Sequence, residues 1–171
     1  EAAGRDLGVN VEVLGATSET AYEEQIQIIE TTLNAADTDA MVVAPLQADS
    51  VANQIANTDV PVVAIDTQVD SDKVLSFVGF DNEEMAALGG KAAAEAAKEA
   101  GWTEITAIGI AGVQGDSTSE ARMKGYQQGI EEAGGTFLMD ELQYANSTAD
   151  QAVTCMEAIV QNHPEGIAII F

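Results

Sequence analysis

Four polar residues stand just beyond apolar segments of the sequence, and the chemistry that they offer is hydrogen bonding. Asp66 follows the apolar run Val62–Ile65. Arg122 ends the segment that follows the run Ile105–Ala111, and Asn146 and Ser147 come shortly after the run Thr136–Gln143. A carboxylate accepts hydrogen bonds, whereas a guanidinium donates several in one plane. Ligands of open α/β sheets bind beyond the carboxyl ends of the strands. These four residues are therefore candidates for contact with a polar ligand.

Position alone leaves a structural alternative open for each of them. Asp66 is equally well placed as a turn or helix-cap aspartate, and Arg122 as a surface arginine in the first turn of a helix. The run Asn146–Thr148 matches a glycosylation sequon, but its first two residues as caps of the following helix are the simpler interpretation. Asp70 and Asp72 could touch a calcium ion, yet without further ligands a solvated turn is favoured.

No pattern of a known catalytic or cofactor site is present. The chain lacks G-x-G-x-x-G after a strand, G-x-x-x-x-G-K-[ST] and G-x-S-x-G. A Ser-His-Asp triad would need His163, the single histidine, which follows a helix and therefore belongs at the edge opposite the ligand edge; Trp102 belongs there too. One cysteine, Cys155, cannot form an internal disulfide. We expect no enzyme, no cofactor and no metal site.

Composition and charge exclude some classes of binding partner. Among 171 residues, six are Lys or Arg and 29 are Asp or Glu, which gives a net charge of −23, while 46% of the residues are hydrophobic. That hydrophobic share suffices for a core, so the acidity does not imply disorder. Nucleic acid needs clustered cations, and the six here are scattered, so a nucleic-acid partner is excluded. No apolar run approaches the roughly 18 residues of a membrane span, so no direct membrane insertion is expected.

Short apolar runs alternate with segments of helical period. The predicted strands are Val9–Ala16, Ala40–Ala44, Val62–Ile65, Val74–Phe80, Ile105–Gly112, Thr136–Gln143 and Ile167–Phe171. Several are continuously apolar, which is typical of parallel strands covered on both faces. Apolar residues recur at helical spacing between them, as in Tyr22, Ile26, Ile29 and Leu33. This alternation predicts doubly wound, three-layer α/β domains with mainly parallel sheets.

The helix near Tyr22 is expected to begin with a capping box of Thr20 and Glu23. Both ends of the chain read as interrupted elements. Glu1–Gly8 resembles the last turns of a helix, and Gly166–Phe171 stops inside a buried strand. No signal peptide is visible either. Because both ends read as interrupted elements, we expect a piece of a longer protein.

One step in the alternation lacks a helix. The polar stretch Asp66–Lys73 joins two strands directly and is too short for a crossover helix. The strand that follows leads into Asp81 and Asn82 and a new series of helix–strand units. We therefore predict two α/β lobes, residues 1–80 and 81–171, each without its full set of strands.

Four ordered motifs resemble a known family. They are Met41–Pro45, Val60–Thr67, Ser76–Asn82, and Gly112 with Arg122–Tyr126. Together they are similar to the periplasmic sugar-binding proteins of the ribose/galactose type, the type I solute receptors of ABC transporters. The resemblance implies a monosaccharide bound between two hinged lobes, delivery to a transporter permease, a removed signal peptide and a periplasmic or lipoprotein-anchored extracellular location. A neutral sugar suits the two charged candidates, because its hydroxyls both donate and accept hydrogen bonds.

Carried over residue by residue, the resemblance assigns ligand contact to Asp66 and Arg122 and the first hinge crossing to Asp81 and Asn82. It also implies that an opening strand precedes the chain and that an Asn-Asp ligand motif follows it. Three departures concern the identity of the sugar. Thr67 stands where ribose-type members often have an arginine, and we count it with Asn146 and Ser147 among the ligand-binding candidates. Asn146 or Ser147 replaces an aromatic residue, and the glycine expected a few residues after Asn82 is Ala86.

Two other functions remain open. The effector core of a LacI-type transcription regulator shares this fold and this aspartate–arginine pattern, and an enzyme would need catalytic groups that the sequence lacks. For the receptor we expect Asp66 and Arg122 to face each other across the cleft and to be joined by ligand rather than by a direct salt bridge.

Overall fold

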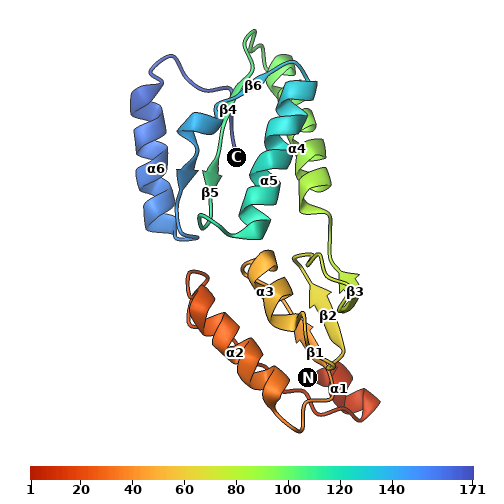
Figure 1. Ribbon diagram of the computed structural model, residues 1–171. Helices are drawn as coiled ribbons and strands as arrows, with labels where there is room; N and C mark the ends of the chain where they lie inside the picture. Colours follow the sequence, from red (N-terminus) through yellow and green to blue (C-terminus); the bar gives the residue numbers. More distant parts are fainter.

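The computed structural model describes residues 1–171 and arranges them as two α/β lobes (Figure 1). The N-terminal lobe holds the parallel sheet β1-β2-β3 with three helices. Its elements are α1 (Ala2–Leu7), α2 (Tyr22–Asn34), β1 (Met41–Val43), α3 (Ala48–Ile55), β2 (Val62–Ile65) and β3 (Val74–Val78). The predicted parallel α/β architecture is confirmed, and α1 lies where the last turns of a helix are expected.

The C-terminal lobe contains the parallel sheets β6-β4-β8 and β5-β7. Its helices are α4 (Asn82–Glu99), α5 (Ser117–Glu132), the 3₁₀ helix η1 (Met139–Glu141) and α6 (Ala149–Asn162), and its strands are β4 (Thr106–Ile108), β5 (Ile110–Ala111), β6 (Thr136–Phe137), β7 (Gln143–Tyr144) and β8 (Ile169–Ile170). Two predicted strands are each split in two. One breaks at Gly109, where a Cβ would lie 2.6 Å from the Met123 sulfur, and the other is interrupted by η1.

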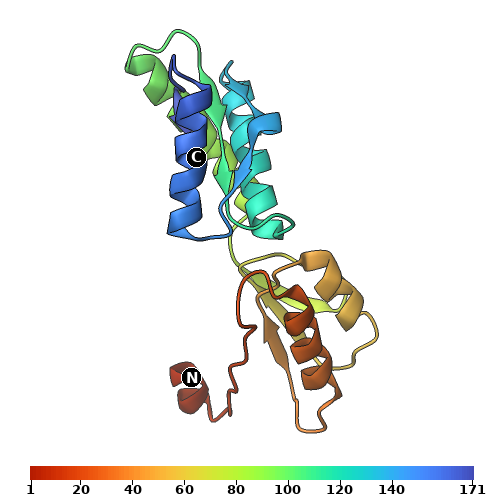
Figure 2. The same ribbon diagram turned by 90° about the vertical axis from the view of Figure 1, so that its left-hand side faces the viewer.

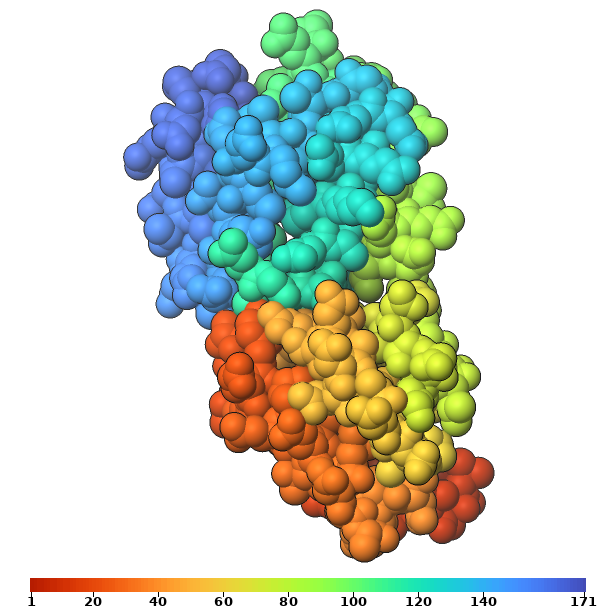
Figure 3. Space-filling view, viewed as in Figure 1, coloured from red at the N-terminus to blue at the C-terminus, as the bar shows by residue number.

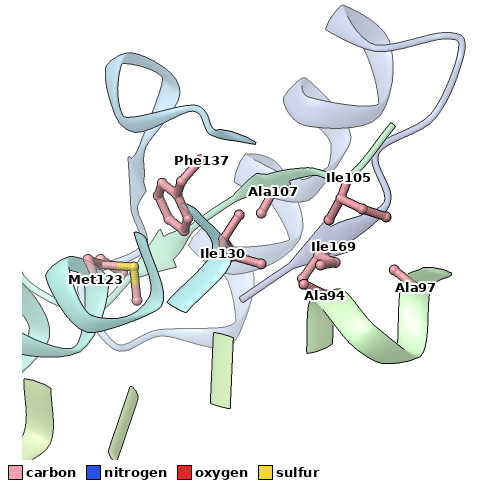
Figure 4. Close-up of a cluster of buried hydrophobic side chains, with 9 residues drawn as sticks. Ala94, Ala97, Ile105, Ala107, Met123, Ile130, Phe137 and Ile169 are labelled. Carbon is pink, nitrogen blue, oxygen red and sulfur yellow. The ribbon is translucent and has the colours of Figure 1, made fainter. Parts of the chain in front are cut away.

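The core of the C-terminal lobe lies between these short strands and two helices rich in small residues (Figure 4). Ala94 of α4 and Ile130 of α5 are fully buried against the strand residue Ala107. The helices approach so closely that a Cβ on Gly129 would collide with the carbonyl oxygen of Ala87. Glycine is needed there because backbone packs against backbone.

The N-terminal lobe packs both of its longer helices on one face of its sheet. Val51 and Ile55 of α3 are fully buried in a cluster that includes Val62 of β2. The other face stays open, because Val42 is 63% exposed and Leu75 is 70% exposed. The prediction that continuously apolar strands are covered on both faces is therefore wrong for β1, whose central residue Val42 faces the open side.

Two local predictions are wrong. Residues Val9–Ala16 form no strand and are mostly exposed. They do not pair with β1, whose outer edge stays free because β1 pairs only with β2. The capping box of Thr20 and Glu23 is absent, since α2 begins after Ala21 without a side-chain cap. Instead Glu24 accepts hydrogen bonds from the backbone and hydroxyl of Thr17, at 2.8 and 2.6 Å.

A short segment joins the two lobes between β3 and α4, and the lobes lie end to end (Figure 2). Asp81 begins the second lobe as the N-cap of α4, with its Oδ1 accepting from the amides of Glu83 and Glu84 at 3.1 and 3.0 Å. The division into domains 1–80 and 81–171 and the hinge role of Asp81 and Asn82 stay predictions. None of the helices combines the length and the hydropathy that crossing a membrane requires.

Candidate functional site

The candidate site lies at the seam where the two lobes meet. The space-filling view shows the lobes in contact along this seam (Figure 3). Segments that follow the carboxyl ends of β1 and β5 touch there, since the Ser117 amide donates to the Leu46 carbonyl at 3.4 Å. The seam is thus the edge at which ligands of open α/β sheets bind.

Backbone conformation sets three predicted site residues apart. Asp66, Asn146 and Ser147 have φ values of 65°, 46° and 54°, and no other non-glycine residue of the chain has a positive φ. Each follows a strand, Asp66 after β2 and the other two after β7. The left-handed region costs of order 1–3 kcal/mol for a residue with a Cβ, and such strain concentrates at ligand sites. This backbone conformation is compatible with ligand contact by the three residues.

Asp66 offers a free carboxylate. Its side chain is exposed and has no hydrogen-bond or ion-pair partner in the chain, while its amide donates to the Val78 carbonyl at 3.1 Å and so fixes the backbone. The turn ends with Thr67, whose amide donates to the Ile65 carbonyl at 2.7 Å. The carboxylate oxygens remain available to accept hydrogen bonds.

Arg122 is tied to the connection between the lobes. Its Nε donates to Oδ1 of Asn82 at 2.9 Å, and the Asn82 amide group donates to the Asp66 carbonyl at 3.4 Å. Asn82 therefore stands between the two charged candidates, and no ion pair joins them. The terminal nitrogens of Arg122 have no partner in the chain, so this fixed guanidinium can donate to a ligand.

Thr67 is placed differently from the other candidates. It is only 6% exposed, and its hydroxyl lies 2.6 Å from the hydroxyl of Thr118 in the opposite lobe. A hydroxyl has one proton and two lone pairs. The Thr67 hydroxyl, which the sequence analysis proposed for ligand contact, thus uses part of its hydrogen-bonding capacity on Thr118 of the other lobe.

Asn146 and Ser147 do not cap α6. The N-cap is Thr148, which makes no side-chain bond to the helix amides, and the Asn146 side chain donates to Gln151 at 2.9 Å. The interpretation of these residues as simple helix caps is therefore wrong. Ser147 lies beside Gly112, where an added Cβ would be 3.0 Å from the hydroxyl oxygens of both Ser147 and Ser119.

Sequence reasoning missed the residues that connect the lobes. Ser117 and Thr118 lie in the polar segment after β5, but nothing distinguished them there from their neighbours. Tyr22 was assigned to the core-facing stripe of α2, yet its hydroxyl donates to the Gln114 carbonyl at 3.2 Å, across the seam. Partial burial raises the pKa of Tyr22, and the nearby carboxylates of Asp116, Glu120 and Glu19 raise it further.

His163 and Trp102 lie away from the seam. His163 Nε2 is 2.7 Å from Glu141 Oε2 and its Nδ1 is 3.5 Å from Glu165 Oε1. The hydrogen bond with Glu141 raises the pKa of His163, although partial burial opposes it. Trp102 packs near Gly166, where an added Cβ would be 3.1 Å from its ring. Neither ring can contact a ligand held at the seam.

Two other features carry no comparable chemistry. No group of three or more His, Cys, Asp or Glu side chains is arranged to hold a metal ion. An open hollow of about 700 Å³ lies at the far end of the N-terminal lobe, lined by polar residues beyond α2 and α3 such as Asn57 and Asp59.

Comparison with protein families matches residues 1–171 to the periplasmic binding protein domain. No curated protein matches the chain. A carbohydrate transporter solute binding protein from Agrobacterium radiobacter, solved in complex with D-arabinose, is 29% identical over 99% of this chain and 58% of its own, with a TM-score of 0.78.

Two further solved structures are similar. A glucose-galactose binding protein from Geobacillus stearothermophilus is 25% identical, with 95% of this chain and 57% of its own covered and a TM-score of 0.81. A periplasmic sugar binding protein from Legionella pneumophila is also 25% identical, with 99% and 61% covered and a TM-score of 0.79. The chain thus spans 57–61% of the length of these three proteins.

Proposed function

The chain belongs to the periplasmic binding protein domain family, and on that premise we propose that it forms the ligand-binding part of a receptor for a monosaccharide. The sugar is held at the seam between the two lobes. Asp66, Arg122, Asn146 and Ser147 contact it, and Asp81 and Asn82 form a hinge. The intact receptor delivers the sugar to the permease of an ABC transporter and works outside the cytoplasm, in the periplasm or on a lipoprotein anchor.

One observation carries this proposal, namely that the seam holds both a free carboxylate and a guanidinium whose orientation is fixed. The carboxylate of Asp66 has no partner, and Arg122 is held by one nitrogen while its other nitrogens stay free. A monosaccharide presents hydroxyl protons to the first and hydroxyl or ring oxygens to the second. The names of the similar structures, which mention D-arabinose and glucose-galactose, support a sugar of this size.

Binding without turnover fits the same site. The similar structures are named as solute or sugar binding proteins rather than enzymes. The seam offers hydroxyl, amide, carboxylate and guanidinium groups, but the single histidine lies elsewhere, paired with Glu141. A hydroxyl nucleophile at the seam would therefore lack a histidine base.

Calorimetry on the full-length protein tests the proposed function. Arabinose, ribose, galactose, glucose and fucose are titrated separately, with a disaccharide as the size control. We expect at least one monosaccharide to bind with one site per chain and to be recovered unchanged by NMR. Failure of the whole panel to bind, or the appearance of a new product, would contradict the proposal.

A further inference from the structure

The direct hydrogen bonds between the lobes, apart from those at Asn82, converge on one short segment. Residues Gln114–Thr118, which include the first two residues of α5, contact the beginning of α2, the turn before α3 and the end of β2. The contacts are Tyr22 hydroxyl to Gln114 carbonyl (3.2 Å), Gln47 Nε2 to Gly115 carbonyl (3.5 Å), Ser117 amide to Leu46 carbonyl (3.4 Å), Ala48 amide to Ser117 hydroxyl (3.1 Å), and the Thr67 and Thr118 hydroxyls (2.6 Å). The last two are the shortest and involve side chains that substitution can remove.

Ser117 acts on α3 from the opposite lobe. The first amides of a helix have no partner within the helix and are usually satisfied by a side-chain cap. Helix α3 has no such cap of its own, because the Gln47 side chain does not accept from its amides. The hydroxyl of Ser117 accepts from Ala48, the first residue of α3. When the lobes are in contact, which we call the closed form, Ser117 therefore supplies a hydrogen bond that the side chain before α3 does not.

Thr118 acts on the end of β2. Its hydroxyl meets that of Thr67, which is the only buried polar residue of the chain. Separation of the lobes would remove this hydrogen bond and expose both hydroxyls to water.

From these contacts we propose that Ser117 and Thr118, with their partners Ala48 and Thr67, form a latch that holds the lobes closed directly. The closed form is then populated before sugar arrives, and the affinity depends on side chains that do not touch the sugar. The effect on affinity rests on the proposed function, whereas the effect on the lobes does not. The apparent dissociation constant rises as the closed fraction falls. Loss of one neutral hydrogen bond corresponds to about two- to tenfold.

The test uses the full-length protein with one spin label on each lobe. Gln27 and Glu157 are exposed, so Gln27→Cys and Glu157→Cys in a Cys155→Ser background carry the labels. The latch variants are Ser117→Ala, Thr118→Val and their combination. Asp116 caps α5 through the Ser119 amide at 2.6 Å, so Ser117→Ala leaves that helix capped. Thr154→Val is the matched control, because its hydroxyl bonds only to the Asp150 carbonyl within α6.

Double electron–electron resonance spectroscopy gives the distance between the two spin labels with and without sugar, and calorimetry gives the affinity for sugar. We expect the latch variants to shift the ligand-free protein toward longer distances, to bind sugar about two- to tenfold more weakly, and to regain the short distance at saturating sugar. The control should behave as wild type. If wild type binds no sugar but the variants still open, the latch stands and the proposed function fails.

Three results would overturn the latch. One is a set of variants with wild-type distances and affinity. Another is weaker sugar binding without any change in the ligand-free distances, which would make these hydroxyls sugar contacts. The third is a ligand-free wild-type protein that populates only the long distance.

Discussion

Arg122 and Asn82 are joined by a 2.9 Å hydrogen bond from the Nε of the arginine to the side-chain oxygen of the asparagine. Asn82 is the first residue of α4, directly after the segment that connects the lobes. The orientation of the guanidinium is therefore set at the connection itself. A proposed ligand contact and a proposed hinge residue share one interaction, so their functions should be coupled.

Substitution of the two charged candidates should abolish most sugar binding. Asp66→Asn and Arg122→Ala in the full-length protein should each weaken binding by about 30- to 1,000-fold, or about 2–4 kcal/mol, because ligand hydroxyls lose a charged partner. Asparagine is chosen at position 66 because it tolerates the positive φ of 65°. Both side chains are exposed, so the free energy of unfolding should change little. Calorimetry and urea unfolding measure the two effects.

The matched control for the charge change is Lys124→Ala. Lys124 lies on the same helix as Arg122 and pairs at 2.9 Å with Glu83, within the same lobe. The Lys124→Ala variant should bind sugar with wild-type affinity. Wild-type affinity in both the Asp66 and the Arg122 variant would mean that the site is elsewhere.

Asn82 should act through Arg122. Asn82→Ala removes the acceptor at 2.9 Å, frees the guanidinium to rotate and should weaken sugar binding by about three- to tenfold, roughly 1 kcal/mol. In the Arg122→Ala background the same substitution should cost little, because residues in contact are not additive. A double-mutant cycle by calorimetry measures this coupling. Full additivity would show that Asn82 acts independently of Arg122.

Packing of α4 against α5 should be intolerant of a methyl group at Gly129. Gly129→Ala places its Cβ against the backbone of Ala87 and 2.8 Å from the Lys91 nitrogen. It should lower the free energy of unfolding by about 1–3 kcal/mol or more. Gly89→Ala is the control. It lies on the exposed side of α4 with its nearest neighbour the Tyr126 ring at 3.3 Å, and its effect should stay within about 1 kcal/mol. Equal effects in urea unfolding would refute backbone contact as the cause.

His163 should make stability depend on pH. The hydrogen bond with Glu141 raises its pKa above the ordinary value of 6.5. A group with a raised folded-state pKa contributes stability that is complete below the unfolded-state value and is lost as the pH rises through the folded-state value. Wild type should therefore lose stability between about pH 6.5 and the raised pKa, and His163→Gln should lose less over the same window. Urea unfolding across this range, with NMR titration of the single histidine, checks the sign. A titration midpoint below 6.5 would contradict it.

The elements with local sequence signals were predictable. The apolar run at β2 and the apolar spacing of α2 are each visible within one segment. Val9–Ala16 has the composition of a strand but pairs with no other strand, and a strand exists only through its partner. The open face at Val42 was missed for the same reason, since covering depends on what packs there and not on the strand itself.

The site divides in a similar way. The positions of Asp66, Asn146 and Ser147 beyond strand ends were predictable because a strand end is a local property of the sequence, although their positive φ was not predictable. Their contact with a ligand stays a prediction. The contact between Thr67 and Thr118 depends on how the two lobes are oriented. Tyr22 illustrates the limit of helical periodicity, because a stripe assigns a side chain to a face without showing that its far end reaches another lobe.

The close contact of α4 and α5 has a mechanical consequence. With Ala87 carbonyl against Gly129, there is no soft side-chain layer through which these helices could slide. Helix α4 starts at the connection between the lobes, and α5 carries Ser117, Thr118 and Arg122. If the lobes rotate about that connection, Ser117, Thr118 and Arg122 should therefore move with α4 as one rigid unit. We expect rapid mixing with sugar to give a single relaxation rate rather than a spread of rates.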